Sequence, residues 1–454
     1  MGGGARGDIQ SLVILRPMAA LVCAFGLWGL RGDHIRENRF LFGFAAALFA
    51  LLALQLIPLP PIIWGALPGR EIVSEIDRVA GLGKIWRPIS MVPSGTWNAL
   101  FSLFVPMAVL LLGVQLSRDQ RFQLLLVLLA LGLASGVVGL LQVISAADGP
   151  LYFYKVTNNG SAVGLFANRN HQAMLLASLF PMLAIYASAG IKSVEQARIR
   201  LWSAIAAGVV VIPLVLVTGS RAGLIVSVVA LLAVPFLFQS PEIHRPAKRK
   251  IPRKYLRFLV VAFAVIGLGL LTILFARAQA LDRLLSQDQG NDDRLAMWPP
   301  IVQMAWKYFP IGSGVGSFVE INQIDEPLRL LTPEYSNHAH NDWLEVYMTA
   351  GGLGLTLIGI GVVAWFRTSL AIWKSSWLRG RDLGFARLGS IIILIMALAS
   401  IGDYPLRVPS IMCLVVVAAL WLQGGSKHAY TLPESESDRS LADSPLTAVQ
   451  SSQG

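Results

Sequence analysis

The sequence predicts an all-α protein that crosses a membrane many times, because its composition, its apolar runs and its basic loops each indicate that fold class. Hydrophobic residues make up 55% of the 454 residues, charged residues only 14%, and the mean hydropathy is +0.62. A soluble domain usually carries about 25% charged residues. Since so few charges cannot cover a surface that faces water, we expect lipid to surround much of the apolar surface.

Apolar runs of membrane-spanning length follow one another along most of the chain. A transmembrane helix needs roughly 20 mostly apolar residues, and on that scale the chain contains about eleven spans, within a range of about ten to twelve. We expect them at residues 11–30, 40–57, 97–116, 122–145, 171–190, 201–217, 222–239, 258–276, 346–366, 388–402 and 409–424. Arg16 and Pro17 interrupt the first run, so it forms either one helix or a broken one.

Basic residues cluster in five of the loops between these runs. They are Arg31, Arg36 and Arg39; Arg118 and Arg121; Lys192, Arg198 and Arg200; the bases of 239–257; and Arg367, Lys374, Arg379, Arg381 and Arg387. Loops rich in Lys and Arg stay in the cytoplasm. If all five do, the spans alternate consistently from end to end. Residues 58–96, 146–170 and 277–345, with the turns at 218–221 and 403–408, then face outside.

This topology divides the chain into four parts. Residues 1–276 hold N-terminal spans with short loops, 277–345 form a long outer segment, and 346–424 hold the C-terminal spans. The polar residues 425–454 have the composition of a disordered tail. Within the outer segment, apolar residues recur at helical spacing from Asp293 to Tyr308, which predicts an amphipathic helix at the membrane surface.

Composition also argues against several classes of function. Only Cys23 and Cys413 are present, both in apolar runs, so a disulfide framework is excluded. No Cys/His metal spacing occurs, and we expect no cofactor and no resident metal. The net charge of +11 comes from short loops rather than from a basic domain with interleaved aromatics, so we do not expect nucleic acid as a partner.

The polar stretch 336–345 leads into the ninth predicted span and contains His338 and His340. Histidine is suited to accepting a proton from a hydroxyl near neutral pH. The residue that orients such a histidine is expected among its neighbours: Asn341, Asp342 and Glu345. The alternatives are helix capping without chemistry, or a His-x-His metal pair whose further ligands are missing from the sequence pattern.

Two arginines on the outer side are candidates for binding an anion. Arg221 lies between two apolar runs that almost no loop separates, and Arg294 lies near the start of the predicted amphipathic helix. A guanidinium at this depth can hold a phosphate with two parallel hydrogen bonds. The alternatives are a helix-end arginine that reaches the lipid headgroups, for Arg221, and a solvated ion pair with an adjacent aspartate, for Arg294.

Further polar groups appear at the outer ends of other spans. Arg169 and Asn170 open the fifth span, and Asp403 and Arg407 lie in the turn between the last two. Each pair is also compatible with helix capping or turn formation. Their common location on the outer side makes them supporting candidates for the site.

Three sequence stretches resemble the O-antigen ligase and O-antigen polymerase superfamily of bacterial membrane glycosyltransferases, with the strongest likeness between residues 165 and 354. They are Gly164-Leu-Phe-Ala-Asn-Arg-Asn-His171, Thr218-Gly-Ser-Arg-Ala-Gly223, and the segment from Trp298 through the Gly312–Phe318 stretch to Asn341. The ligase pattern His-Asn, nine residues, Gly, two residues, Gly is met by His340, Asn341, Gly351 and Gly354.

The resemblance implies an inverting, metal-independent enzyme of the bacterial inner membrane with its active site facing the periplasm. The implied donor is a glycan linked through pyrophosphate to undecaprenol. Carried over to this sequence, Arg221 and Arg294 would bind the pyrophosphate and His340 would be the base for the acceptor hydroxyl, with His338 close enough to assist.

The acceptor stays open at this point. For a ligase it would be lipid A–core, for a polymerase a second lipid-linked repeat unit, and a protein-glycosylating ligase is a third possibility. A transporter that makes no bonds is the alternative from another class. We disfavour it because transporters place their sites near the middle of the bilayer, often in repeated halves, whereas these polar groups gather at the outer ends and the sequence shows no repeat.

Overall fold

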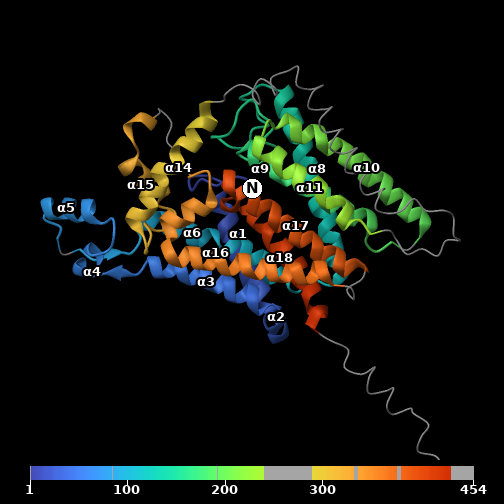
Figure 1. The fold of residues 1–454 in the computed structure, drawn as a ribbon, viewed down its shortest axis with the longest axis horizontal. Coiled ribbons are helices and arrows are strands. Elements are labelled where there is room, and N and C mark those ends of the chain that lie inside the picture. Colours follow the sequence, from blue (N-terminus) through green and yellow to red (C-terminus); the bar gives the residue numbers. More distant parts are fainter. Residues whose placement is uncertain are drawn as a thin grey trace, which may run out of the picture.

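The structure of the chain is a computed structural model, which describes residues 2–83, 85–191, 193–239, 289–331, 336–375 and 380–430. The predicted fold class is confirmed: the protein is an all-α, multi-pass membrane protein (Figure 1). The helices of the bundle are α1 (Leu12–Trp28), α3 (Arg39–Gln55), α6 (Pro93–Ser102), α7 (Phe104–Gly113), α8 (Arg118–Ile144), α9 (Arg169–Ser188), α10 (Val194–Val217), α11 (Arg221–Leu237), α16 (Asp342–Lys374), α17 (Gly380–Gly402) and α18 (Pro409–Tyr430).

Most predicted spans coincide with one of these helices. The first is a single helix that runs through Pro17, and the third is divided into α6 and α7. Within the described residues, six helices or joined helices are long and apolar enough to cross a membrane, and shorter apolar helices accompany them. The predicted span 258–276 lies outside the described residues. At the C-terminus, α18 continues to Tyr430, so the first residues of the predicted disordered tail are helical instead.

Contacts between the basic loops place several of them at one end of the bundle. Arg381 Nη1 donates to Asp119 Oδ1 at 2.8 Å, and Gly190 lies against the side chain of Arg381. Gln423 Nε2 donates to the carbonyl of Glu37, which lies in the short helix α2 (Gly32–Glu37). This grouping agrees with the alternation of spans that the basic loops predict. At the opposite end, which we call the site end, α9, α11 and α16 begin and α17 finishes.

Helix α9 forms the centre of the bundle and is buried along almost its whole length. It packs against α8, α10, α11 and α17, and beyond its polar first turn it is mostly apolar on all sides, as expected for a helix without a solvent face. Small residues let it approach its neighbours closely. A side chain at Gly223 of α11, for example, would overlap Ala173, so this glycine brings the start of α11 against the start of α9.

Smaller elements cover the site end (Figure 1). Between α3 and α6 lie β1 (Pro58–Leu59), α4 (Pro61–Gly65), α5 (Glu71–Val79) and β2 (Arg87–Pro88), with β1 and β2 paired antiparallel so that Pro58 faces Pro88. Before α16 lie α14 (Gln289–Tyr308), α15 (Phe318–Asp325) and the 3-10 turn η1 (Leu328–Leu330). Another 3-10 turn, η2 (Pro405–Arg407), links α17 to α18.

The amphipathic helix predicted over 293–308 is present as part of α14. Its buried face packs against α15 and α16 through Ile301, Met304, Ala305 and Tyr308, while Val302 and Trp306 are exposed. We expected its apolar face to lie on the membrane, but the buried part of that face packs against protein instead. Helical periodicity identifies an apolar face, but not what covers it.

A buried arginine fastens the 58–92 segment to the glycine-rich loop 312–317. The guanidinium of Arg70 is fully buried and donates to the carbonyls of Pro68 (2.7 Å), Ile89 (2.8 Å) and Gly312 (2.8 Å). Burial lowers the pKa of Arg70 to about 10, so it remains charged at neutral pH. The loop continues this connection, since Ser313 N donates to the carbonyl of Met348 in α16 at 3.0 Å. Arg70 thus joins this segment to the start of α16.

We expect Arg70→Lys to lower the free energy of unfolding by about 1–3 kcal/mol, because an ammonium cannot serve the three divergent carbonyls that the planar guanidinium reaches. The matched control is Arg78→Lys at an exposed ion pair with Glu75, for which we expect a change within about 0.5 kcal/mol. Thermal unfolding of the purified proteins in detergent measures both. Equal melting temperatures for wild type and Arg70→Lys would contradict the assigned role.

Candidate functional site

Polar side chains from four parts of the chain meet at the site end. They come from the starts of α9, α11 and α16 and from the turn that follows α17. Each helix start is fixed by a capping side chain that accepts a backbone N–H: Asn168 for α9, Ser220 for α11 and Asn341 for α16. Asn341 therefore has the capping role that the sequence left open, with its Oδ1 3.0 Å from Leu344 N.

His340 lies immediately before this cap in an unusual backbone conformation. Its φ is 48°, which makes it the one non-glycine residue with positive φ in the described part of the chain. Such a conformation is costly for a side chain with a Cβ and tends to occur at functional sites. The side chain is 17% exposed, and its Nδ1 lies 3.1 Å from Oδ1 of Asp403, which is fully buried.

Asp403 is the centre of a hydrogen-bonded chain that leads to Arg221. Its Oδ2 accepts a hydrogen bond from Asn170 Nδ2 at 2.6 Å, and Asn170 Oδ1 accepts one from the Ser220 hydroxyl at 2.7 Å. Ser220 caps α11, whose first residue is Arg221. Because every link is buried, the start of α11 has a fixed position relative to His340.

A second polar group surrounds the first turn of α16. His338 Nδ1 lies 3.1 Å from Glu345 Oε1, and Glu345 also accepts the backbone N–H of Ala339 at 3.0 Å. Arg407 contacts Glu345 and Asp342, each at 3.3 Å. Burial lowers the pKa of Arg407, but these two carboxylates outweigh that effect and raise it above its ordinary value. Arg407 therefore stays charged and compensates the buried acids.

The expected orienting residues thus differ from the one that the structure provides. Asn341 caps the helix, Asp342 binds Arg407 and Glu345 binds His338, whereas His340 pairs with a residue further along the chain. That partner is Asp403. The two histidines turn to different carboxylates, and among the described residues no cluster of three metal-ligating side chains is found.

Tyr404 fills the space between the imidazole rings. Its ring centroid lies 4.3 Å from that of His338, 5.0 Å from that of His340 and 5.1 Å from that of His171. His171 is buried on the far side, with its Nε2 4.0 Å from Asp403 Oδ2. An aromatic wall of this kind limits the orientations of the histidines. Sequence reasoning did not single out Tyr404, although it lies next to Asp403.

Two of the candidate arginines lie at the turn that leads into α11. Arg221 is half-buried at the start of α11, and Arg169 is half-buried with its Nη1 beside Gly219, next to the same turn. The structure therefore brings Arg169 and Arg221 together at one turn. Arg294 lies in the second turn of α14, which begins at Gln289 rather than at Asp293. The side chain of Arg294 is outside what the structure describes.

The first glycine of the His-Asn motif has a structural explanation. Gly351 adopts φ 57° inside α16, and a Cβ there would overlap the carbonyl of Pro310. Gly352 N donates to that same carbonyl at 2.8 Å. The resulting break in α16 accommodates the segment that leads into the glycine-rich loop, so this glycine shapes the backbone next to the site.

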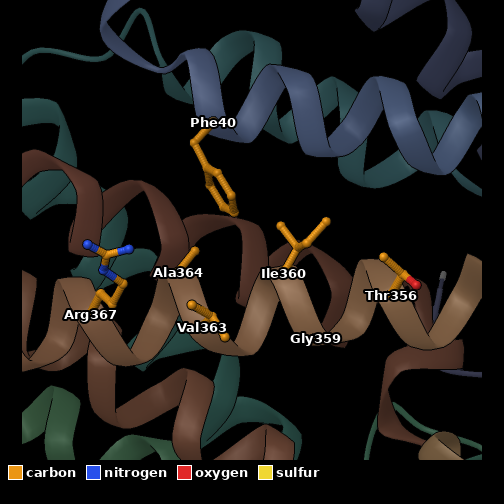
Figure 2. Close-up of a pocket in the computed structure, with 7 residues that line it drawn as sticks. All are labelled: Phe40, Thr356, Gly359, Ile360, Val363, Ala364 and Arg367. Atoms are coloured by element: carbon orange, nitrogen blue, oxygen red, sulfur yellow. The ribbon is translucent and has the colours of Figure 1, made fainter.

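A hollow of about 500 Å³ lies away from these groups, between α3 and α16 (Figure 2). It is lined by Phe40, Thr356, Gly359, Ile360, Val363, Ala364 and Arg367. Thr356 lies 16 residues beyond His340 along the chain, roughly 20–25 Å at 1.5 Å per residue. With its mostly apolar lining and its distance from the histidines, the hollow is separate from the polar site.

The comparisons with known proteins support the same family as the sequence motifs. Residues 206–359 match the sequence model of the family described as O-antigen ligase. The match includes α11, α14, α15, the glycine-rich loop and the first half of α16, and hence Arg221, Arg294, His338 and His340. No curated protein matches the chain.

Proposed function

We propose, from the premise that this chain belongs to the O-antigen ligase and polymerase superfamily through residues 206–359, that it transfers a glycan from undecaprenyl pyrophosphate to an acceptor hydroxyl. The observation that carries the proposal is the pairing of His340 with the buried Asp403, linked through Asn170 and Ser220 to the turn that holds Arg221. A proton acceptor and a phosphate-binding group thus lie on one rigid framework. We place the site on the periplasmic face of the inner membrane.

In the proposed reaction, His340 is the general base. A proton on Nδ1 that donates to Asp403 leaves Nε2 with a lone pair for the acceptor hydroxyl. The hydroxyl oxygen attacks the anomeric carbon while its proton moves to Nε2, and the Asp403 carboxylate stabilises the imidazolium that forms. Direct displacement of the leaving group inverts the anomeric configuration.

The negative charge of the leaving group gives the arginines their proposed role. When the bond between the anomeric carbon and the phosphate oxygen breaks, undecaprenyl pyrophosphate departs with the electron pair. We propose that Arg221, together with Arg169 at the same turn, stabilises this growing charge. Arg294 is proposed as the second pyrophosphate ligand on the strength of the family resemblance. In this scheme the lipid-linked donor supplies the driving force, and no cofactor takes part.

Lipid A–core is the acceptor that we propose, which makes the protein an O-antigen ligase. Polymerisation onto a second lipid-linked repeat unit is the alternative, since it would use the same donor and the same residues. A non-catalytic transporter fits less well, because the polar cluster lies at the ends of α9, α11, α16 and α17 rather than in broken helices halfway along them.

An in vitro transfer assay tests the proposal. Purified protein is mixed in EDTA with undecaprenyl-pyrophosphate glycan and either lipid A–core or no second acceptor, beside the His340→Ala variant. A lipid A–core band shifted by the glycan, which requires His340, is the expected result. If the donor glycan became longer in the absence of lipid A–core, the protein would be assigned as a polymerase instead of a ligase. If the folded wild-type protein transferred no glycan, either with or without added divalent metal, the proposal that it is an enzyme would be contradicted.

A further inference from the structure

The segment between α3 and α6 presents an apolar surface on α4, α5 and the loop after α5, which we call the α4–α5 face. Its residues are Ile62, Ile63, Ile72, Ile76, Val79, Leu82, Ile85 and Trp86. Ile62 is 88% exposed, Val79 74% and Trp86 61%, values expected for the surface of a span but unusual for an element at the end of a bundle. A contiguous apolar surface of this kind marks a site of interaction.

Helix α5 is amphipathic, with Ile72, Ile76 and Val79 along one side and the exposed Glu75–Arg78 ion pair on the flank next to it. It differs from α14, the other amphipathic helix at the site end, because α14 buries its apolar residues against α15 and α16. None of the described residues forms such a core with the apolar side of α5. Among the described residues, protein therefore covers the apolar side of α14 but not that of α5.

Interactions on the inner side hold the α4–α5 face outward. Trp64 is buried and its Nε1 donates to the carbonyl of Pro88 at 2.7 Å, while Arg70 binds three carbonyls below α5. Arg87 pairs with Asp77 from the polar side of α5, at an ion pair that keeps the pKa of Asp77 below its ordinary value. These contacts fix both flanks of the segment on its inner side and leave its apolar residues exposed.

The position of the segment indicates what covers the face. It follows α3 directly and leads into α6, and apolar residues in and next to those helices are exposed as well: Leu54, Ile57, Trp97 and Phe101 are each 45–47% exposed. In a multi-pass membrane protein that surface contacts lipid. Trp86 and Trp97 also match the preference of tryptophan for the membrane–water interface.

We propose that the α4–α5 face is a membrane-binding surface, which inserts into the lipid leaflet at the site end while Glu75 and Arg78 face water. An amphipathic helix lying in the interface plane has this arrangement. Since Arg70 connects the segment to the glycine-rich loop and so to α16, membrane binding here fixes the depth of His340 relative to the lipid headgroups. The inference depends on the membrane location of the protein and not on its proposed chemistry.

Site-directed spin labelling in lipid nanodiscs tests the proposal. Cys23 and Cys413 are first replaced by alanine, and a nitroxide is then attached to single cysteines in the variants Ile76→Cys, Val79→Cys, Glu75→Cys and Arg78→Cys. The full-length protein is placed in nanodiscs of phosphatidylethanolamine and phosphatidylglycerol. Collision of each label with apolar oxygen and with a water-soluble nickel chelate reports its surroundings.

We expect the labels at positions 76 and 79 to collide at least about threefold more with oxygen, relative to the nickel chelate, than the label at 78, with the label at 75 between them. Similar nickel accessibility at all four positions would overturn the proposal. Spin–spin broadening at 76 and 79 that disappears on dilution with unlabelled protein would also overturn it, by assigning the face to a second copy of the chain. The readout needs no substrate, so its outcome is independent of the transfer assay.

Discussion

We expect His340→Ala to lower the rate of glycan transfer by about 10²–10⁴-fold, the range typical of losing a general base. The substitution removes the group to which the acceptor hydroxyl would pass its proton, and it leaves the hydrogen bond between Asp403 and Asn170 in place. The variant should still insert and fold. Transfer of labelled glycan to lipid A–core, normalised to protein recovered in the membrane, measures the effect.

The companion variant Asp403→Asn tests whether catalysis needs the pairing of His340 with Asp403, or only the histidine itself. Asparagine keeps the size of the side chain but cannot stabilise the imidazolium by charge, and the corresponding change in a Ser-His-Asp triad costs about 10⁴-fold. We expect kcat to fall while KM for the donor changes little, because Asp403 is fully buried and acts through His340. A purely structural role would not produce this division between kcat and KM.

The matched control is Asp325→Asn, which removes a carboxylate at the same end of the bundle, where Asp325 pairs with Lys307 on the surface. It should leave kcat and KM close to those of the wild type. If His340→Ala turned over at the wild-type rate, His340 would not be the general base. If instead Asp403→Asn were fully active and His340→Ala inactive, His340 would act without the aspartate, and the proposed orientation of its ring would be wrong.

The helical bundle was predictable because apolar length is a local property. Apolar runs of about 20 residues identify spans without any knowledge of their partners, and the helix over 293–308 followed from its spacing. The covering of that helix was not predictable. Helices α5 and α14 both have apolar faces, yet within the described residues only that of α14 packs on protein, and the difference depends on which elements the fold brings beside each helix.

The candidate site shows the same division between local and distant information. His340 and Arg221 could be identified from short motifs, and the capping role of Asn341 was among the alternatives. The partner of His340 was sought among its sequence neighbours, but Asp403 lies 63 residues further along the chain. The positive φ of His340 and the capping of α16 direct the neighbouring carboxylates elsewhere. The positive φ and the approach of Asp403 are not visible in the sequence, so Asp403 could be chosen only as a supporting candidate.

We expect Arg221→Lys to impair transfer by about 10²–10³-fold, although the positive charge is retained. Removing one contact that stabilises a developing anion typically has an effect of this size. A lysine ammonium is a point charge and cannot reproduce the two parallel hydrogen bonds of a guanidinium with a pyrophosphate. The control is Arg78→Lys, at an exposed arginine on α5, which should transfer glycan at the wild-type rate.

Inhibition by the product distinguishes a pyrophosphate-binding role of Arg221 from lipid anchoring. If Arg221 holds the pyrophosphate, undecaprenyl pyrophosphate should inhibit Arg221→Lys at least about tenfold more weakly than the wild type, which corresponds to about 1.4 kcal/mol. Undecaprenyl monophosphate, which offers fewer oxygens to the guanidinium, should discriminate less between the two proteins. If Arg221 only reaches the lipid headgroups, Arg221→Lys should leave both inhibition constants and turnover unchanged.

Unchanged constants would mean that the pyrophosphate binds away from the start of α11. A selective loss of pyrophosphate affinity would instead mean that it binds beside the Ser220–Asn170–Asp403 chain that positions His340.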